Sequence, residues 1–231
     1  MGAETARRLS ASGASVTVVD RNEQLALQVA DEVGGVAHCG DVSDSAFCDS
    51  VIAGAVERLG RLDVLVNAAG IIVRAGGLET SDEAWHRIMG VNVSGTFFMC
   101  RAALRVMKAQ GRGAIVNFGS IWGDLGSAGV AAYCASKGAV HNLTRALALD
   151  HANDGIRINA VCPGEVRTPM LQSERAEPVT QEMLARIAAT VPMGRLAEPE
   201  EIANVVCFLA SDEASYMTGA MVAVDAGYGA C

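Results

Sequence analysis

The sequence predicts a single α/β domain built on a doubly wound, Rossmann-like parallel sheet, for three reasons. Nearly continuous apolar runs such as 62–66 and 114–118 are typical of parallel strands covered on both faces. These runs alternate with longer segments whose apolar residues recur at helical spacing, as in a strand–helix repeat. With 231 residues and 51% hydrophobic content, the chain can bury one substantial core. We therefore expect one domain over residues 1–231.

The composition argues against several classes of function. The net charge of -8 and the lack of a basic cluster disfavour a nucleic-acid partner. The seven cysteines are scattered without C-x-x-C spacing and the four histidines form no H-x3-H pair, so we expect neither a metal site nor a disulfide framework. Reduced thiols fit a cytoplasmic protein. No apolar run approaches the ~18 residues of a membrane span, and no leader opens the chain, so we expect no membrane partner.

The first half of the chain alternates helices and strands, with Asn22 as a helix cap. Residues 51–59 carry apolar side chains at 3.6-residue spacing, as expected of a helix packed on the core. The expected order is helix 2–9, strand 16–20, helix 22–33, strand 36–39, a helix containing 51–59, and strand 62–66.

The second half follows the same plan. Thr80 and Glu83 have the spacing of a capping box, and apolar residues between 97 and 106 form a helical face that we expect to pack, in part against another subunit. Residues from about 169 to 192 show no strand pattern and suit a lid over a substrate. The remaining expected elements are strand 114–118, a helix from Tyr133 to Asp150, strand 156–161, a helix beginning near Pro199, and a closing strand over 219–227.

Ser120, Tyr133 and Lys137 form the candidate catalytic set. Tyr133 and Lys137 are four residues apart on an expected helix, so their side chains share one face, and Ser120 follows a strand whose end can bring its hydroxyl nearby. A free tyrosine has a pKa near ~10, and a nearby ammonium group would lower it. A serine hydroxyl can hold a substrate oxygen while the phenol exchanges its proton. The alternative is a solvated Tyr–Lys contact along the helix.

The set Ser120…Tyr133-x3-Lys137 resembles the short-chain dehydrogenase/reductase family, and the likeness covers nearly the whole chain. The resemblance implies hydride transfer between a nicotinamide cofactor and a secondary alcohol or ketone, in a homotetramer. It makes Tyr133 the acid/base, Lys137 the residue that lowers its pKa and holds the nicotinamide ribose, and Ser120 the residue that positions the substrate. Asn92 matches the family's support for a proton-relay water, although it could instead satisfy backbone groups.

The resemblance also implies a set of cofactor-binding residues. Asp20 ends a strand where a carboxylate would accept hydrogen bonds from the adenosine ribose and repel a 2′-phosphate, which favours NAD over NADP, while Arg21 partly offsets this repulsion and leaves NADP possible. Asp20 could also be a solvated strand-end acid, and Asp41 could cap a helix. The full set is Gly2, Asp20, Arg21, Asp41, Val42, Asn67, Ala68, Ala69, Gly70, Tyr133, Lys137, Pro163, Gly164, Val166 and Thr168.

The chain departs from the family at its start. The family opens with a strand and a turn of the form T-G-x3-G-x-G, of which only the last glycine is matched, by Gly2. That strand would lie between strands 16–20 and 62–66, and its absence leaves them about 10 Å apart. We expect either that these two strands close up and pair or that the N-terminal quarter rearranges, unless the natural protein begins upstream. Phosphate binding should be weak without the turn, although the α-amino group of Met1 could attract a phosphate.

Two hypotheses about function follow. The first is an NAD-preferring oxidoreductase that acts on a small-molecule secondary alcohol or ketone of unspecified structure. The second is a catalytically impaired scaffold whose helix faces still assemble into an oligomer. Cofactor binding distinguishes them.

Overall fold

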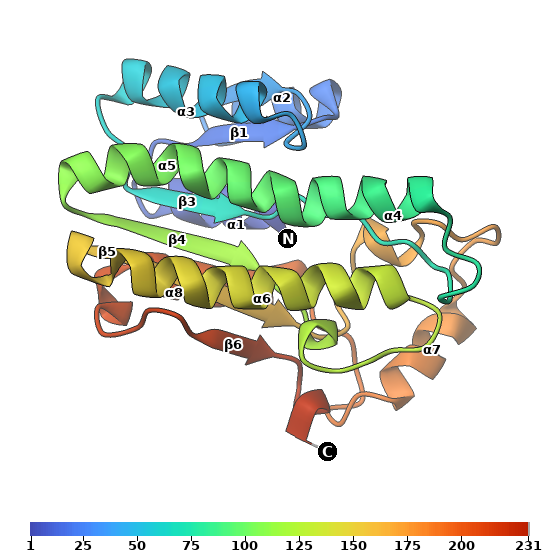
Figure 1. Ribbon diagram of the computed structural model, residues 1–231. Helices are drawn as coiled ribbons and strands as arrows, with labels where there is room; N and C mark the ends of the chain where they lie inside the picture. The colour runs from blue at the N-terminus through green and yellow to red at the C-terminus, as the bar shows by residue number, and fades with distance from the viewer. Residues whose placement is uncertain (231) are drawn as a thin grey trace.

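A computed structural model describes residues 1–230 as helices surrounding parallel strands (Figure 1). The first half contains α1 (Gly2–Ala11), β1 (Thr17–Asp20), α2 (Glu23–Glu32), β2 (Val36–Cys39), α3 (Ser45–Leu59) and β3 (Val64–Asn67). The second half contains α4 (Asp82–Met89), α5 (Thr96–Gln110), β4 (Gly113–Phe118), α6 (Ala131–His151), β5 (Ile156–Pro163), α7 (Gln181–Ala189), α8 (Pro199–Ala210) and β6 (Met221–Val224). The predicted fold class is confirmed.

The strands form two separate parallel sheets. One contains β1 and β2, and the other has the order β3-β4-β5-β6. The expectation that strands 16–20 and 62–66 close up and pair is therefore wrong: among the described residues, β1 pairs only with β2, and β3 pairs only with β4. Figure 1 shows the two units one above the other, with the β1–β2 pair at the top.

Helix packing explains why the two sheets stay apart yet remain attached. On one face, α3 packs against α5 in a core cluster that includes Cys48, Ile52, Met99 and Ala103, and Val19 of β1 packs against the same cluster. Burial of such apolar side chains stabilises the contact by roughly 25 cal/mol per Å². Because this interface fixes α3 over α5, the β1–β2 unit cannot slide toward β3 without unpacking it.

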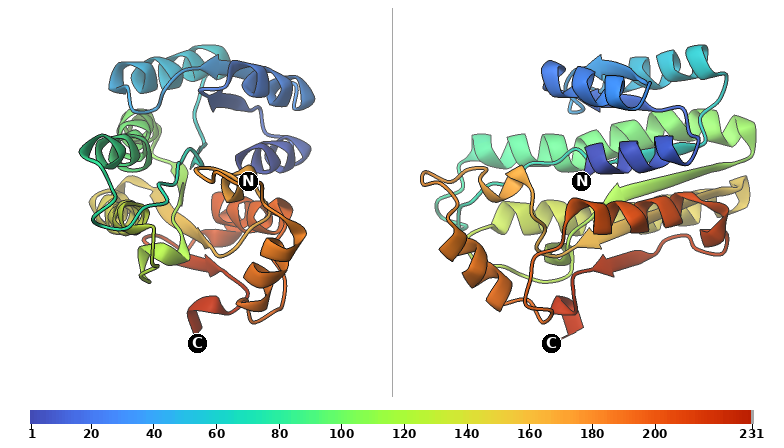
Figure 2. Two further views of the ribbon diagram at one scale, coloured as in Figure 1. Left: turned by 90° about the vertical axis from the view of Figure 1, so that its right-hand side faces the viewer. Right: turned by 180° about the vertical axis from the view of Figure 1, so that it is seen from behind.

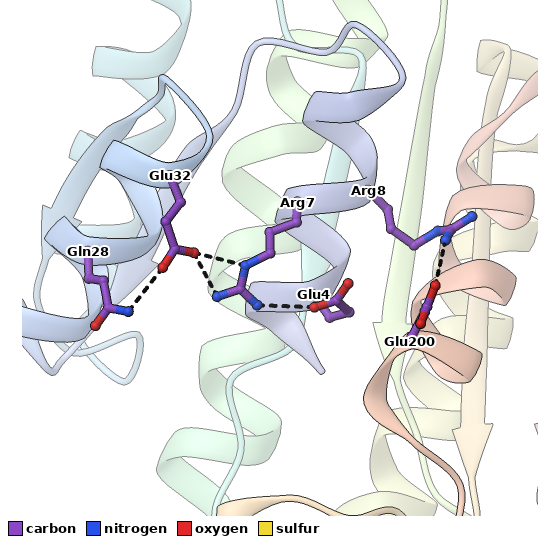
Figure 3. A network of polar contacts seen from close by, with 6 residues as sticks. All are labelled: Glu4, Arg7, Arg8, Gln28, Glu32 and Glu200. Atoms are coloured by element: carbon purple, nitrogen blue, oxygen red, sulfur yellow. Dashed lines mark hydrogen bonds and ion pairs between the residues drawn. The ribbon is translucent and has the colours of Figure 1, made fainter.

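Helix α1 joins the two units on the other face (Figure 2). Arg7 forms an ion pair with Glu32 of α2 at 2.7 Å, and the next residue, Arg8, forms one with Glu200 of α8 at 3.2 Å. Figure 3 shows these arginines pointing to opposite sides of α1. All four side chains are partly exposed, so solvent weakens both pairs. These two ion pairs therefore add little to stability and serve mainly to orient α1 between α2 and α8.

One local feature, the cap of α4 (Asp82–Met89), differs from expectation. The cap of α4 is Ser81, whose hydroxyl accepts from the backbone N–H of Ala84 at 3.1 Å, whereas the hydroxyl of Thr80 donates to the carbonyl of Gly76 at 2.7 Å. The predicted capping box at Thr80 is thus wrong, because the helix begins one residue later. A capping box does occur at Glu198 of α8. The predicted lid region contains a short 3-10 turn and α7, with no strand.

Candidate active site

The candidate site lies where the parallel strands end. In Figure 1 the arrowheads of β3, β4 and β5 point to the same edge, and their last residues are Asn67, Phe118 and Pro163. Ser120 follows β4 by two residues, while Tyr133 and Lys137 lie in the first two turns of α6. Ligands of open α/β sheets bind at this edge, so the topology brings the predicted residues to the expected end of the fold.

The three predicted catalytic side chains meet in the interior. Ser120, Tyr133 and Lys137 are 5%, 7% and 5% exposed, which excludes a solvated surface contact. The Ser120 hydroxyl is close enough to the Tyr133 phenol to lower its pKa. The Lys137 ammonium donates to the carbonyl oxygen of Phe118 at 2.7 Å and lies 5.6 Å from the centre of the Tyr133 ring. Helix spacing thus places the pair on one face, as the sequence predicts.

The electrostatics of the pair differ from the sequence prediction. Burial raises the pKa of Tyr133 to about 12, while the neighbouring Ser120 hydroxyl acts in the opposite direction. Burial lowers the pKa of Lys137 to about 8. The expectation that Lys137 lowers the pKa of Tyr133 is wrong for this structure, because desolvation dominates and the ammonium is directed at the Phe118 carbonyl. The phenol is protonated at neutral pH and can donate a proton to a carbonyl oxygen.

Asn92 lies in a π-helical segment between α4 and α5, and its side chain is fully engaged. Its Oδ1 accepts from the backbone N–H of Ile71 at 2.8 Å, and its Nδ2 donates to the Ile71 carbonyl and the Ser136 hydroxyl, each at 2.9 Å. The structure therefore shows the backbone-satisfying role that the sequence left open. π-Helical bulges often occur at functional sites, and this one fixes the loop after β3 beside α6.

Asn67 and Asn117 connect the ends of β3 and β4. The Asn67 amide donates to Asn117 Oδ1 at 2.9 Å, and the Asn117 amide donates to the Thr144 hydroxyl at 2.9 Å. Asn67 thus ties the ends of two neighbouring strands together. Asn117 was missed as a functional residue, although a lone amide inside the apolar run 114–118 was a usable signal.

The residues predicted to bind the adenosine end are exposed at the carboxyl ends of β1 and β2. Asp20 accepts the backbone N–H of Asn22 at 2.8 Å, and Arg21 is exposed beside it. Asp41 accepts the backbone N–H of Ser43 at 2.8 Å, whereas the cap of α3 is Asp44. The helix-capping alternative for Asp41 is therefore wrong. Val42 is the next residue and packs against the α3–α5 cluster.

The loop after β3 runs past the lysine. A Cβ built on Gly70 would lie 3.6 Å from Lys137 Nζ and 3.5 Å from Asn92 Oδ1, and one on Gly2 would lie 3.1 Å from Ala68 Cβ, so the start of α1 abuts this loop. The backbone of Ala69 continues the same turn. An ammonium group has three donors, and Lys137 has one acceptor among the described residues. Its unused donors beside an open glycine fit the ribose hydroxyls of a nicotinamide dinucleotide.

The turn after β5 lies at the same edge of the sheet as the loop after β3. Gly164 lies so close to Asp225 that a Cβ would come within 2.9 Å of its Cα, which favours glycine here. Val166 is 6% exposed and pairs with Ala197, and Thr168 precedes the 3-10 turn that starts the lid. Pro163 ends the strand. These four residues therefore lie at the same strand edge as Ser120.

Two charged residues outside the predicted catalytic and cofactor-binding sets lie next to Tyr133. Arg74 donates to the lid carbonyls of Ser173 at 2.9 Å and Met170 at 3.1 Å, and burial lowers its pKa. Burial also raises the pKa of Glu165. Both charges act on the Tyr133 phenol. Their proximity depends on how the 70–77 loop and the lid fold together, and no local pattern indicates it.

Residues 1–230 contain no cluster of three His, Cys, Asp or Glu side chains arranged to hold a metal ion. In the same residues, none of the helices combines the length and apolar character that a bilayer crossing requires.

A doubly wound parallel fold with a buried Ser–Tyr–Lys set at its carboxyl edge defines a dinucleotide-dependent oxidoreductase of the acid/base type. A family model described as enoyl-(acyl carrier protein) reductase matches residues 1–229. The chain belongs to the short-chain dehydrogenase/reductase family. It is an NAD(P)-dependent oxidoreductase that interconverts a secondary alcohol and a ketone.

Three known proteins illustrate the similarity. Meso-2,3-butanediol dehydrogenase of Serratia marcescens is 44% identical, with 98% of this chain and 89% of that protein aligned. The 3-ketoacyl-(acyl-carrier-protein) reductase of Brucella melitensis, solved with NADH, is 33% identical with a TM-score of 0.92 over 98% of this chain and 92% of its own. The gluconate 5-dehydrogenase of Burkholderia cenocepacia J2315, solved with NADP and tartrate, is 33% identical with a TM-score of 0.89 over 99% and 90%.

Proposed function

We propose that the protein is an NAD-preferring dehydrogenase in which Tyr133 exchanges a proton with the substrate oxygen, Ser120 holds that oxygen, and Lys137 binds the nicotinamide ribose. One observation carries this proposal. The three side chains share a buried site at the carboxyl edge of the sheet, where the Ser120 hydroxyl acts on the Tyr133 phenol and the Lys137 ammonium has two donors without an acceptor among the described residues. Asn92 supports the site by fixing the loop that faces Lys137.

The raised pKa of Tyr133 suits carbonyl reduction, because the phenol already carries the proton that the substrate oxygen needs. The nicotinamide, when bound, supplies or accepts the hydride, and its oxidised ring carries a positive charge. A positive charge near Tyr133 favours the phenolate and so assists alcohol oxidation. Arg74 acts on Tyr133 in the same direction, while Glu165 opposes it.

The preference for NAD rests on Asp20. Its exposed carboxylate ends β1, and a unit negative charge there would repel a 2′-phosphate. Arg21 limits the discrimination. We propose that the rest of the cofactor is bound by residues at the start of α1 and after the ends of the strands. They are Gly2, Asp41, Val42, Asn67, Ala68, Ala69, Gly70, Pro163, Gly164, Val166 and Thr168.

We infer a small secondary alcohol or its ketone as substrate, in keeping with the butanediol relative. The lid segment 169–192 would close over it, since Arg74 already links the loop after β3 to the lid carbonyls. A homotetramer in the cytoplasm is the proposed working form. Phe97 and Leu149 support it, because they expose apolar surface on α5 and α6, at 36% and 80% exposure.

The test begins with cofactor binding. NADH titrated into the protein should increase nicotinamide fluorescence and saturate. Tyr133→Phe should then abolish turnover of a secondary alcohol without changing NADH binding, while the matched control Tyr216→Phe, at a fully exposed tyrosine, should leave both unchanged. Turnover by Tyr133→Phe near the wild-type rate would remove Tyr133 from its role.

The cofactor preference has its own test. Asp20→Asn removes the charge and keeps the acceptor oxygen, so it should shift the ratio of kcat/KM for NAD over NADP toward NADP by about tenfold, equivalent to ~1.4 kcal/mol. Asp31→Asn, at an exposed acid near the end of α2, is the control and should not change the ratio. An unchanged ratio in Asp20→Asn would contradict the assignment.

A second candidate function is an oligomeric scaffold without turnover. The observation that favours it is the separation of β1 from β3 beside the start of α1, where the family binds the pyrophosphate. The absence of NADH binding at millimolar concentration, together with an intact oligomer in analytical ultracentrifugation, would establish this reading over the dehydrogenase.

A further inference from the structure

A buried histidine lies directly behind the catalytic serine. His141 is 1% exposed and sits one helical turn beyond Lys137 on α6. Its Nε2 lies 3.3 Å from the backbone nitrogen of Ser120 and 3.3 Å from the Sγ of Cys162. Its Nδ1 lies 3.1 Å from Oδ1 of Asp124, although without the alignment of a hydrogen bond. Of these neighbours, only Ser120 belongs to the predicted catalytic and cofactor-binding set; Cys162 and Asp124 do not.

Two glycines make room for the imidazole ring. A Cβ on Gly119 or on Gly123 would clash with ring atoms of His141. Gly119 directly precedes Ser120, and Gly123 ends the 3-10 turn Ile121–Gly123 that follows it. The backbone around Ser120 is therefore shaped to the ring, and the ring in turn limits where that backbone can lie.

The hydrogen bonds fix the tautomer of His141. Because the Ser120 backbone N–H donates to Nε2, that nitrogen presents a lone pair, and the proton of the neutral ring is assigned to Nδ1. Asp124 faces that proton, with Arg145 3.7 Å from the same carboxylate oxygen. This arrangement keeps Nε2 available as an acceptor.

The cluster of Cys162, His141 and Asp124 has the residue types of a nucleophilic triad, but two facts argue against that reading. Burial raises the pKa of the Cys162 thiol to about 12, which disfavours the reactive thiolate. In addition, the Nε2 that would remove the thiol proton already accepts the Ser120 amide. The interaction of this cluster that bears on the site is the hydrogen bond from the Ser120 amide to His141 Nε2.

We propose that His141 is a positioning residue for Ser120: it accepts the serine's backbone amide, and the ring held between two glycines sets where the serine hydroxyl meets the substrate oxygen. The hydroxyl also accepts the Trp122 backbone N–H at 3.2 Å, so the segment is held at both the amide and the side chain. A misplacement of about 1 Å in a catalytic group can cost on the order of 100-fold in rate. The proposal rests on the function assigned to Ser120 above.

The test compares two substitutions at one position. His141→Leu removes the acceptor, and His141→Gln places an amide oxygen near the position of Nε2. His141→Leu should lower kcat by about tenfold or more, with NADH affinity unchanged, and His141→Gln should recover most of that loss. Asn159→Leu is the control, since it removes a different buried polar side chain, which bonds to Met217 and Ala220 and not to Ser120; it should lose stability while keeping kcat.

Amide hydrogen exchange of Ser120 gives a readout that does not need turnover. The Ser120 amide should be protected in the wild type and in His141→Gln, and should exchange faster in His141→Leu. Equal kcat in His141→Leu and the wild type, or unchanged protection of the amide, would overturn the positioning role. If the wild type itself turned over no alcohol, the proposed function would fail, and the exchange result alone would still decide whether His141 holds Ser120.

Discussion

Replacing Lys137 with methionine should stabilise the protein in the absence of cofactor, even though it removes a proposed catalytic residue. Burial lowers the Lys137 pKa from 10.5 to about 8. At about 1.4 kcal/mol per pKa unit, keeping the ammonium charged in the folded state at pH 7 costs roughly 3 kcal/mol. The substitution also removes the hydrogen bond to the Phe118 carbonyl, which costs about 1 kcal/mol of stability. Lys137→Met, which is similar in length, should therefore gain about 2 kcal/mol.

The pH dependence distinguishes this cause from better packing. Between pH 8 and 10.5 the unfolded wild type binds more protons at this lysine than the folded protein does, so this lysine's contribution to wild-type stability rises with pH. The advantage of Lys137→Met should accordingly shrink from pH 7 and be near zero by pH 10. Titrating thiols and phenols act on both proteins and largely cancel in the difference.

Urea unfolding followed by tryptophan fluorescence at pH 7 and pH 10 measures both values. Lys108→Met is the matched control, because Lys108 is an exposed lysine paired with Asp154 at 3.0 Å. The stability of the Lys108→Met protein should differ little from that of the wild type at either pH. A Lys137→Met protein that is less stable than the wild type at pH 7, or whose gain is the same at both pH values, would refute the reasoning.

Three further predictions concern the core, the helix contacts and the thiols. Asn117→Ala should destabilise the protein by about 3 kcal/mol in urea unfolding, because it removes hydrogen bonds to two buried side chains and leaves a cavity in the core; a loss no larger than that of a surface alanine substitution would contradict this. Arg7→Ala should lower the unfolding midpoint only slightly, and the difference should vanish in 1 M salt, since its ion pairs are partly exposed. Iodoacetamide at pH 8 should alkylate exposed Cys39 and spare Cys162, whose pKa burial raises to about 12; mass spectrometry that finds both labelled equally fast would contradict the burial of the Cys162 thiol.

Local patterns predicted the parts of the site that depend on local geometry. The apolar run before Ser120 is a strand, and the four-residue spacing of Tyr133 and Lys137 puts both side chains in one buried place. The direction of the tyrosine pKa shift could not be predicted in the same way. It depends on how much protein covers the phenol, and a motif carries no information about burial.

Longer-range outcomes were also beyond the sequence pattern. The two sheets remain separate because α3 is fixed over α5 and α1 contacts both units, and neither contact can be inferred from the strands themselves. The hydrogen bonds of Asn117 likewise form only in the folded chain, because their partners Asn67 and Thr144 are 50 and 27 residues away in the sequence. A helix cap shifted by one residue, from Thr80 to Ser81, is within the usual uncertainty of helix boundaries.

The division of the strands into two sheets gives the two halves of the site unequal local stability. The backbone groups along one side of β1 and one side of β3 bond to no neighbouring strand among the described residues, so the β1–β2 unit is held to the sheet that carries Ser120 by helix packing and not by strand pairing. Asp20 and Asp41 belong to the looser unit, and the acid/base residues belong to the firmer one. Part of the adenosine's interaction energy would therefore go into ordering that unit, which makes affinity for the dinucleotide sensitive to temperature and denaturant well before the catalytic end melts.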